Sequence, residues 1–127
     1  MPGRILIVDD NADQGRPLAL ILKMSGYDAD FVTSGREALS AIRQRVPHLL
    51  ILDLMMPEMS GIEVLRQLRT DPRTADVPVV IYSASSDEKQ MAQARREGAN
   101  DYWVKVAMRI DEICLRVQSY VPPGRPC

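Results

Sequence analysis

Short apolar runs alternate along this chain with longer segments in which apolar residues recur every three or four positions. The clearest runs are residues 5–8, 49–52 and 79–82, each rich in leucine, isoleucine or valine. Apolar runs of this length are typical of strands that are buried on both faces of a sheet, so we predict central strands there. Residues 28–32 mix acidic and apolar side chains and are expected at a sheet edge. Residues 101–105 are expected to form the last strand.

The segments between these strands have the spacing of amphipathic helices. A serine followed three residues later by a glutamate forms a capping box, a motif that opens helices. The motif occurs at Ser34, Ser60 and Ser85 and predicts three helix starts.

The first and last helices lack this motif. The first contains Pro17, which a helix accepts only near its first turn, so we expect it to begin at Asp13 or Gln14. Gly26 is expected to end it. An apolar stripe over residues 110–120 predicts the last helix. Five strands therefore alternate with five helices, which indicates an α/β protein with a doubly wound parallel sheet.

The composition is that of an ordinary globular chain. Its 127 residues fit one domain, which we place at 1–121, with a proline-rich tail or linker at 122–127. Lys and Arg total 16 against 17 Asp and Glu, which argues against direct binding of nucleic acid as the main function. No long apolar segment predicts a membrane span or a signal peptide.

The two cysteines point to a reducing compartment. Cys114 lies in an apolar helical stripe and is expected in the core, whereas Cys127 is terminal. Their spacing fits neither a metal site nor a disulfide framework. A cytoplasmic protein fits best.

Polar residues follow four of the predicted strands. Parallel strands in a doubly wound sheet end on the same rim, where such sheets bind ligands. These ends carry Asp9 and Asp10, Asp53, Ser83 and Lys105. Each residue alone has an ordinary explanation, as a turn cap, a loop hydroxyl or a solvated lysine. Their coincidence at one rim favours a functional site.

The residue types at this rim suit phosphoryl transfer to an aspartate. Crowded carboxylates raise one another's pKa unless a cation screens them, and Mg²⁺ accepts carboxylate oxygens while keeping several waters. Lys105 offers a point charge for phosphate, and Asp53 can act as the nucleophile. In-line transfer depends on positioning and charge neutralisation more than on acid–base chemistry. His48 begins a strand at the opposite end, so no histidine is placed as a base.

With these residues in place, the chain resembles the response-regulator receiver domains of two-component signalling. The resemblance extends from Arg4 to about Val121. It rests on four motifs: residues 8–10 (Val-Asp-Asp), residues 53–57 with Gly61, the Ser-Ala pair at 83–84, and Lys105. It implies a flavodoxin-like sheet with strand order 2-1-3-4-5.

The resemblance also implies roles for the site residues. Asp53 would accept a phosphoryl group from the phosphohistidine of a histidine kinase or of a phosphotransfer protein. Mg²⁺ would be held by Asp9 or Asp10, by Asp53 and by the backbone carbonyl of Met55.

Signal output would depend on residues that sense the phosphoryl group. Ser83 and Lys105 would bind its oxygens, and the ring of Tyr102 would turn inward as Ser83 moves. The change would reach a downstream domain or protein through the face formed by the fourth helix, fifth strand and fifth helix.

One departure from the family pattern is Val106, where the family usually has proline. Because a cis bond before a non-proline residue costs about 2.5–4 kcal/mol, we expect a trans Lys105–Val106 bond and a locally shifted loop. Trp103, beside the switch position, is expected in the core.

Other functional classes remain open at this point. An aspartyl-phosphate hydrolase commonly needs a second acid two positions after the nucleophile, and that position is Met55, so we expect no enzyme. A receiver-like interaction module that never carries phosphate is an alternative. A nucleotide-binding flavodoxin-like protein is disfavoured, because the turn after the first strand is acidic and lacks a phosphate-binding glycine pattern.

Overall fold

Five parallel strands form a single sheet in the computed structural model, which describes residues 2–122. The strands are β1 (Arg4–Val8), β2 (Asp28–Val32), β3 (Leu49–Leu52), β4 (Val79–Ser83) and β5 (Asp101–Val104). Their order is β2-β1-β3-β4-β5, so the predicted doubly wound α/β sheet and its order are confirmed. The edge position predicted for residues 28–32 is confirmed as well.

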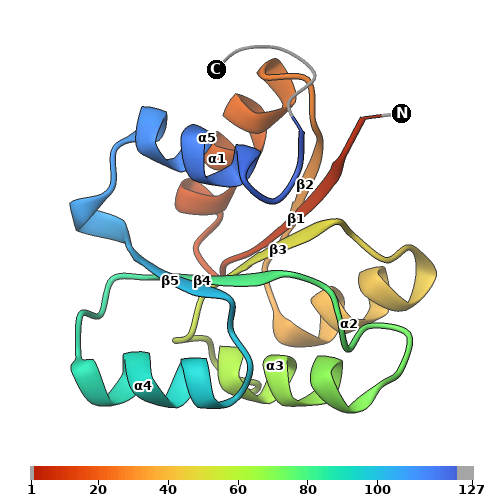
Figure 1. Cartoon of the computed structure of the whole chain (residues 1–127), viewed down its shortest axis with the longest axis vertical. Helices are drawn as coiled ribbons and strands as arrows, with labels where there is room; N and C mark the ends of the chain where they lie inside the picture. Colours follow the sequence, from red (N-terminus) through yellow and green to blue (C-terminus); the bar gives the residue numbers. More distant parts are fainter. Residues whose placement is uncertain (1, 123–127) are drawn as a thin grey trace.

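Helices cover both faces of the sheet. They are α1 (Ala12–Met24), α2 (Gly35–Gln44), α3 (Gly61–Thr70), α4 (Glu88–Arg96) and α5 (Ile110–Gln118). In Figure 1, α1 and α5 lie on one side of the sheet and α2, α3 and α4 lie on the other. Each strand therefore contributes alternate side chains to two separate apolar cores.

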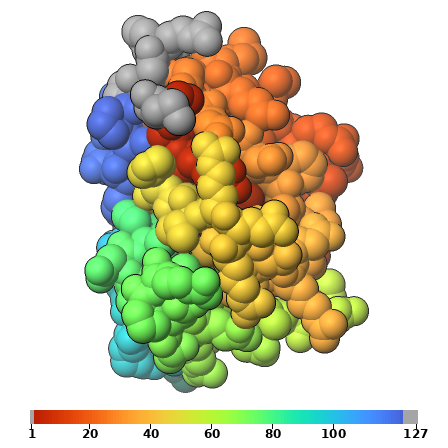
Figure 2. Space-filling model, turned by 90° about the vertical axis from the view of Figure 1, so that its right-hand side faces the viewer, coloured from red at the N-terminus to blue at the C-terminus, as the bar shows by residue number. Residues whose placement is uncertain are grey.

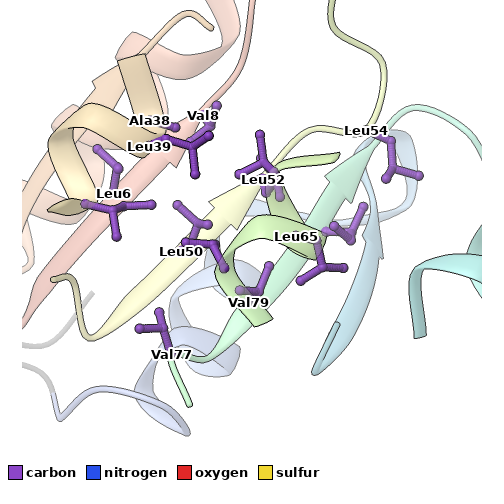
Figure 3. Packing of buried hydrophobic residues seen from close by; sticks show 14 of the residues in the cluster. Leu6, Val8, Ala38, Leu39, Leu50, Leu52, Leu54, Leu65, Val77 and Val79 are labelled. Carbon is purple, nitrogen blue, oxygen red and sulfur yellow. The ribbon is translucent and has the colours of Figure 1, made fainter. Parts of the chain in front are cut away.

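β3 occupies the centre of the sheet and is buried completely. Leu50 and Leu52 enter the core under α2, α3 and α4, whereas Leu49 and Ile51 enter the core under α1 and α5. Figure 3 shows Leu50 and Leu52 close to side chains from β1, β4 and the helix layer, Leu65 among them. Burial on both faces explains why this strand is an uninterrupted apolar run.

The predicted start of the first helix is wrong by one or two residues. α1 begins at Ala12, because the side chain of Asn11 accepts a hydrogen bond from the Asp13 N–H and caps the helix. Pro17 therefore lies in the second turn, where it cannot donate the usual backbone hydrogen bond. The end at Gly26 is confirmed, with a φ of 94° that favours glycine.

The third predicted capping box is also wrong. Ser34 and Ser60 cap α2 and α3 as predicted, through hydrogen bonds from the backbone three residues on. α4, however, begins at Glu88 with Asp87 as its cap. Ser85 instead accepts a hydrogen bond from the Asp87 N–H and shapes the preceding turn.

Several single residues lie where the sequence predicted. Trp103 and Cys114 are each 1% exposed and belong to the interior. The imidazole Nδ1 of His48 accepts a hydrogen bond from the Arg4 N–H, away from the strand ends that carry the acidic residues. The peptide bond between Lys105 and Val106 is trans, since residues 2–122 contain no cis bond.

The side of the molecule opposite the carboxyl ends of the strands carries the loops that lead into the strands. Figure 2 shows this side, with the segment before β3 in yellow beside the segment before β4 in green. Within residues 2–122, no helix has the length and apolar character to cross a membrane. The domain boundary after residue 121 stays a prediction, and residues 123–127 of the predicted tail, Cys127 included, lie outside the described residues.

Candidate functional site

The carboxyl ends of β1, β3, β4 and β5 meet around a pocket of about 500 Å³. Its lining includes every predicted site residue except Tyr102: Asp9, Asp10, Asp53, Met55, Ser83 and Lys105. The parallel direction of the strands produces this convergence. Asp9 and Lys105, which are 96 positions apart in the sequence, lie at the same edge of the sheet although β3 and β4 separate their strands.

Three carboxylates form a cluster on one side of the pocket. Oxygens of Asp9, Asp10 and Asp53 all lie within 4.8 Å of one another. Asp9 and Asp53 are buried and Asp10 is exposed. Backbone N–H groups orient the two buried ones, since Asn11 donates to Asp9 and Met55 donates to Asp53. A hard cation prefers such a set of oxygens, so the residues fit a divalent ion.

A glycine fixes the loop that follows Asp53. The Gly61 N–H donates to the Leu54 carbonyl, which folds the start of α3 back against the end of β3. A Cβ atom on Gly61 would lie 2.2 Å from the Asp53 carbonyl oxygen and 2.9 Å from the Leu54 Cα. Only glycine fits this close approach.

Lys105 places its ammonium among the acidic residues. Its Nζ lies 2.6 Å from Asp9 Oδ2 and 3.4 Å from Asp53 Oδ2. Burial lowers the pKa of Lys105, but the hydrogen bond to Asp9 and the two negative charges outweigh burial and raise that pKa. Lys105 is therefore firmly cationic, and the short turn Lys105–Ala107 after β5 still directs it into the pocket.

The pKa of Asp53 is raised for a different reason. Burial of the carboxyl group raises it most, and the negative charge of Asp9 adds to the effect. Lys105 and the Met55 N–H lower the pKa of Asp53 only in part. The ionised carboxylate therefore has a net energetic cost that a bound cation would relieve.

The two predicted switch residues, Ser83 and Tyr102, both hydrogen-bond to Ser85. Ser83 is 1% exposed at the end of β4, and its hydroxyl oxygen accepts a hydrogen bond from the Ser85 N–H. The Tyr102 hydroxyl donates to the Ser85 carbonyl at 2.8 Å. Tyr102 is only 5% exposed, so its ring is already inward in this conformation.

Two contacts of Lys105 were not predicted from the sequence. Gln14 Oε1 lies 2.5 Å from its Nζ, and the centroid of the Tyr82 ring lies 5.6 Å from the same atom. Nothing in the sequence indicated a role for Gln14 at the site, apart from its place near the predicted start of a helix. Tyr82 was predicted only as an apolar residue of a buried strand.

The chain belongs to the response regulator receiver domain family, whose model matches residues 5–118. The family resemblance seen in the sequence is therefore confirmed, and the chain is a signalling domain of the two-component type. The acidic pocket and the strand order are those expected for such a domain.

Individual relatives support the same assignment. The chain is 38% identical over 119 residues to the DNA-binding response regulator MtrA of Mycolicibacterium paratuberculosis; the match covers 94% of this chain and 51% of MtrA. The chain thus spans about half the length of the curated relatives that it matches.

Two solved structures have the same fold and related sequences. The receiver domain of the Francisella response regulator 1452 gives a TM-score of 0.84 with 28% identity, covering 93% of this chain and 95% of that one. The response regulator Rcp1 in its Mn²⁺-bound form gives 0.80 with 25% identity, covering 94% of each chain.

Proposed function

We propose that Asp53 is the phosphoacceptor of a signalling switch. The single observation that carries this proposal is the Lys105 ammonium, which lies within 3.4 Å of Asp53 in a pocket with three carboxylates. An ammonium at this place can neutralise charge on an incoming phosphoryl group. The phosphodonor is the phosphohistidine of a histidine kinase or of a phosphotransfer protein.

Transfer exchanges one bond to phosphorus for another. A carboxylate oxygen of Asp53 forms a bond to phosphorus while the bond from phosphorus to the donor imidazole nitrogen breaks. The nitrogen keeps the electron pair and is protonated. Lys105 and the Ser83 hydroxyl bind the phosphoryl oxygens, and the Met55 N–H holds the carboxylate in place. These groups act by position and charge, as phosphoryl transfer requires.

The residues fit Mg²⁺ as the cofactor. Asp9, Asp10 and Asp53 would hold it together with the backbone carbonyl of Met55, which also lines the pocket. When bound, the ion supplies charge neutralisation at the carboxylates and the phosphoryl oxygens. The Mn²⁺-bound form of Rcp1 supports a divalent ion in a receiver of this kind.

Output passes through Ser83 and Tyr102. Ser83 moves toward the phosphoryl oxygens and gives up its hydrogen bond from the Ser85 N–H. Tyr102 senses this movement because its hydroxyl donates to the carbonyl of the same Ser85. Phosphorylation thus shifts the populations of two conformations of the face formed by α4, β5 and α5. That face contacts a downstream domain or protein. MtrA, about twice the length of this chain, is a DNA-binding response regulator, which is a precedent for an output that binds DNA.

Acetyl phosphate with Mg²⁺ tests the proposal directly. Intact-mass measurement should show one added phosphoryl group per wild-type chain and none on Asp53→Asn. Equal labelling of the two proteins would remove Asp53 from the mechanism.

Two other functions predict different results in labelling, Mg²⁺ binding and phosphatase assays. A receiver-like module that never carries phosphate would show neither labelling nor Mg²⁺ binding while folded. An aspartyl-phosphate hydrolase would release phosphate from an ester over many turnovers. Met55 disfavours the hydrolase, because its thioether cannot protonate a leaving group at that position.

A further inference from the structure

Three acceptors surround the ammonium group of Lys105. Its Nζ lies 2.5 Å from Gln14 Oε1, 2.6 Å from Asp9 Oδ2 and 3.4 Å from Asp53 Oδ2. An ammonium group has three N–H donors, so these contacts use all of them. The ring of Tyr82, with its centroid 5.6 Å from Nζ, lies against the same group. The ammonium therefore rests closer to Asp9 and Gln14 than to the phosphoacceptor.

Gln14 reaches this position because of where α1 begins. The cap at Asn11 starts the helix directly after Asp9 and Asp10, which puts Gln14 in the first turn, at the edge of the pocket. Gln14 as a whole is an exposed residue, so its replacement should leave the protein folded.

The two short contacts respond differently to events at the site. Asp9 belongs to the carboxylate cluster that fits a divalent ion, and a bound cation weakens its attraction for Lys105. The amide of Gln14 is neutral and is not part of that cluster, so its hydrogen bond to Lys105 remains. A phosphoryl group on Asp53 must then compete with Gln14 for the same N–H donors.

We propose that Gln14 is a positioning residue that holds Lys105 in its resting place and so weakens the binding of the phosphoryl group at Asp53. This role rests on the proposed function of Asp53. Gln14 does not touch the reacting atoms and acts only through Lys105. A hydrogen bond of this kind corresponds to a change of about three- to tenfold in affinity.

Beryllofluoride, a mimic of the phosphoryl group, is a suitable probe. Its dissociation constant in the presence of Mg²⁺ can be measured by NMR titration of wild type, Gln14→Met and a control, Gln67→Met. Methionine matches glutamine in length and helix propensity but offers no strong acceptor. Gln67 is an exposed glutamine of α3 away from the pocket. We expect tightening of about three- to tenfold for Gln14→Met and no change for Gln67→Met.

Urea unfolding without Mg²⁺ tests the contact itself. A double-mutant cycle with Gln14→Met and Lys105→Met should give a coupling energy clearly different from zero. Unchanged beryllofluoride binding in Gln14→Met would overturn the proposal, as would a coupling energy of zero. If wild type binds no beryllofluoride although the cycle shows coupling, the phosphoacceptor function fails and the role of Gln14 fails with it, while the contact stands.

Discussion

At the scale of single residues, the central feature is a carboxylate that is buried and only partly neutralised. Asp53 lies beside Asp9, and the Lys105 ammonium is closer to Asp9 than to Asp53. Burial and the charge of Asp9 raise the pKa of Asp53, so its ionised form destabilises the fold. The same unrelieved charge favours binding of a cation and suits the carboxylate to attack phosphorus.

This destabilisation predicts that Asp53→Asn makes the protein more stable at neutral pH without Mg²⁺. A raised pKa means that the folded state binds the Asp53 proton more tightly than the unfolded state does. The cost of keeping the Asp53 carboxylate ionised in the folded protein is therefore absent at pH values below its ordinary pKa of 3.8, and it is complete above the folded-state pKa. The gain in the free energy of unfolding should therefore shrink as pH falls toward 3.8. Urea titrations of both proteins across this range measure it. A gain that is independent of pH would contradict this explanation.

Gly61 gives a second prediction at this scale. Alanine at this position would bring a Cβ atom 2.2 Å from the Asp53 carbonyl oxygen, which forces the backbone apart. We expect Gly61→Ala to lower the free energy of unfolding by about 1–3 kcal/mol or more and to slow labelling of Asp53 by acetyl phosphate. Urea unfolding and intact-mass kinetics check the two effects. Wild-type stability together with wild-type labelling would show that the close approach is not required.

At the scale of elements, loops and helix ends depend on contacts that are distant in the sequence. Arg69, near the end of α3, donates hydrogen bonds to the carbonyls of Ala75, Val77 and Gly98 and to the Asn100 side chain. It thereby joins α3 to the segments that lead into β4 and β5. Burial lowers the pKa of Arg69 more than the negative charge of Asp76 raises it. The planar guanidinium presents several N–H donors to these acceptors at once.

Replacing Arg69 by lysine should therefore destabilise the fold although the charge is kept. Lysine cannot reach all of these carbonyls at once, and we expect a loss of about 2 kcal/mol. Arg66→Lys on the same helix is the matched control. Arg66 pairs with Glu97 at the surface, where solvent screens the ion pair, so Arg66→Lys should change the free energy of unfolding much less than Arg69→Lys does. Equal losses for both variants in urea unfolding would contradict the role given to Arg69.

At the scale of the whole molecule, the sequence was informative wherever periodicity decides the structure. The apolar runs predicted the central strands because a strand buried on both faces has no other pattern. Parallel connections then bring Asp9, Asp53, Ser83 and Lys105 to one rim, so the convergence of these predicted site residues could be expected without coordinates.

Features that depend on tertiary contacts could not be predicted in this way. Nothing local distinguishes Gln14 from any exposed helical glutamine, since its partner Lys105 is 91 positions away. Ser85 satisfied the capping-box pattern, yet Asp87 caps α4 because Ser85 is used in the preceding turn. Pro17 lies one or two residues deeper in the helix than expected, and packing of Leu18 and Leu22 stabilises α1 around it.

The most direct test of the central claim is to locate the phosphoryl group chemically. Sodium borohydride reduces an aspartyl phosphate to homoserine, and tandem mass spectrometry of peptides then identifies the modified position. After treatment with acetyl phosphate and Mg²⁺, we expect homoserine at position 53 alone. Homoserine at Asp9 or Asp10, or no reduction product in a folded and treated protein, would contradict it.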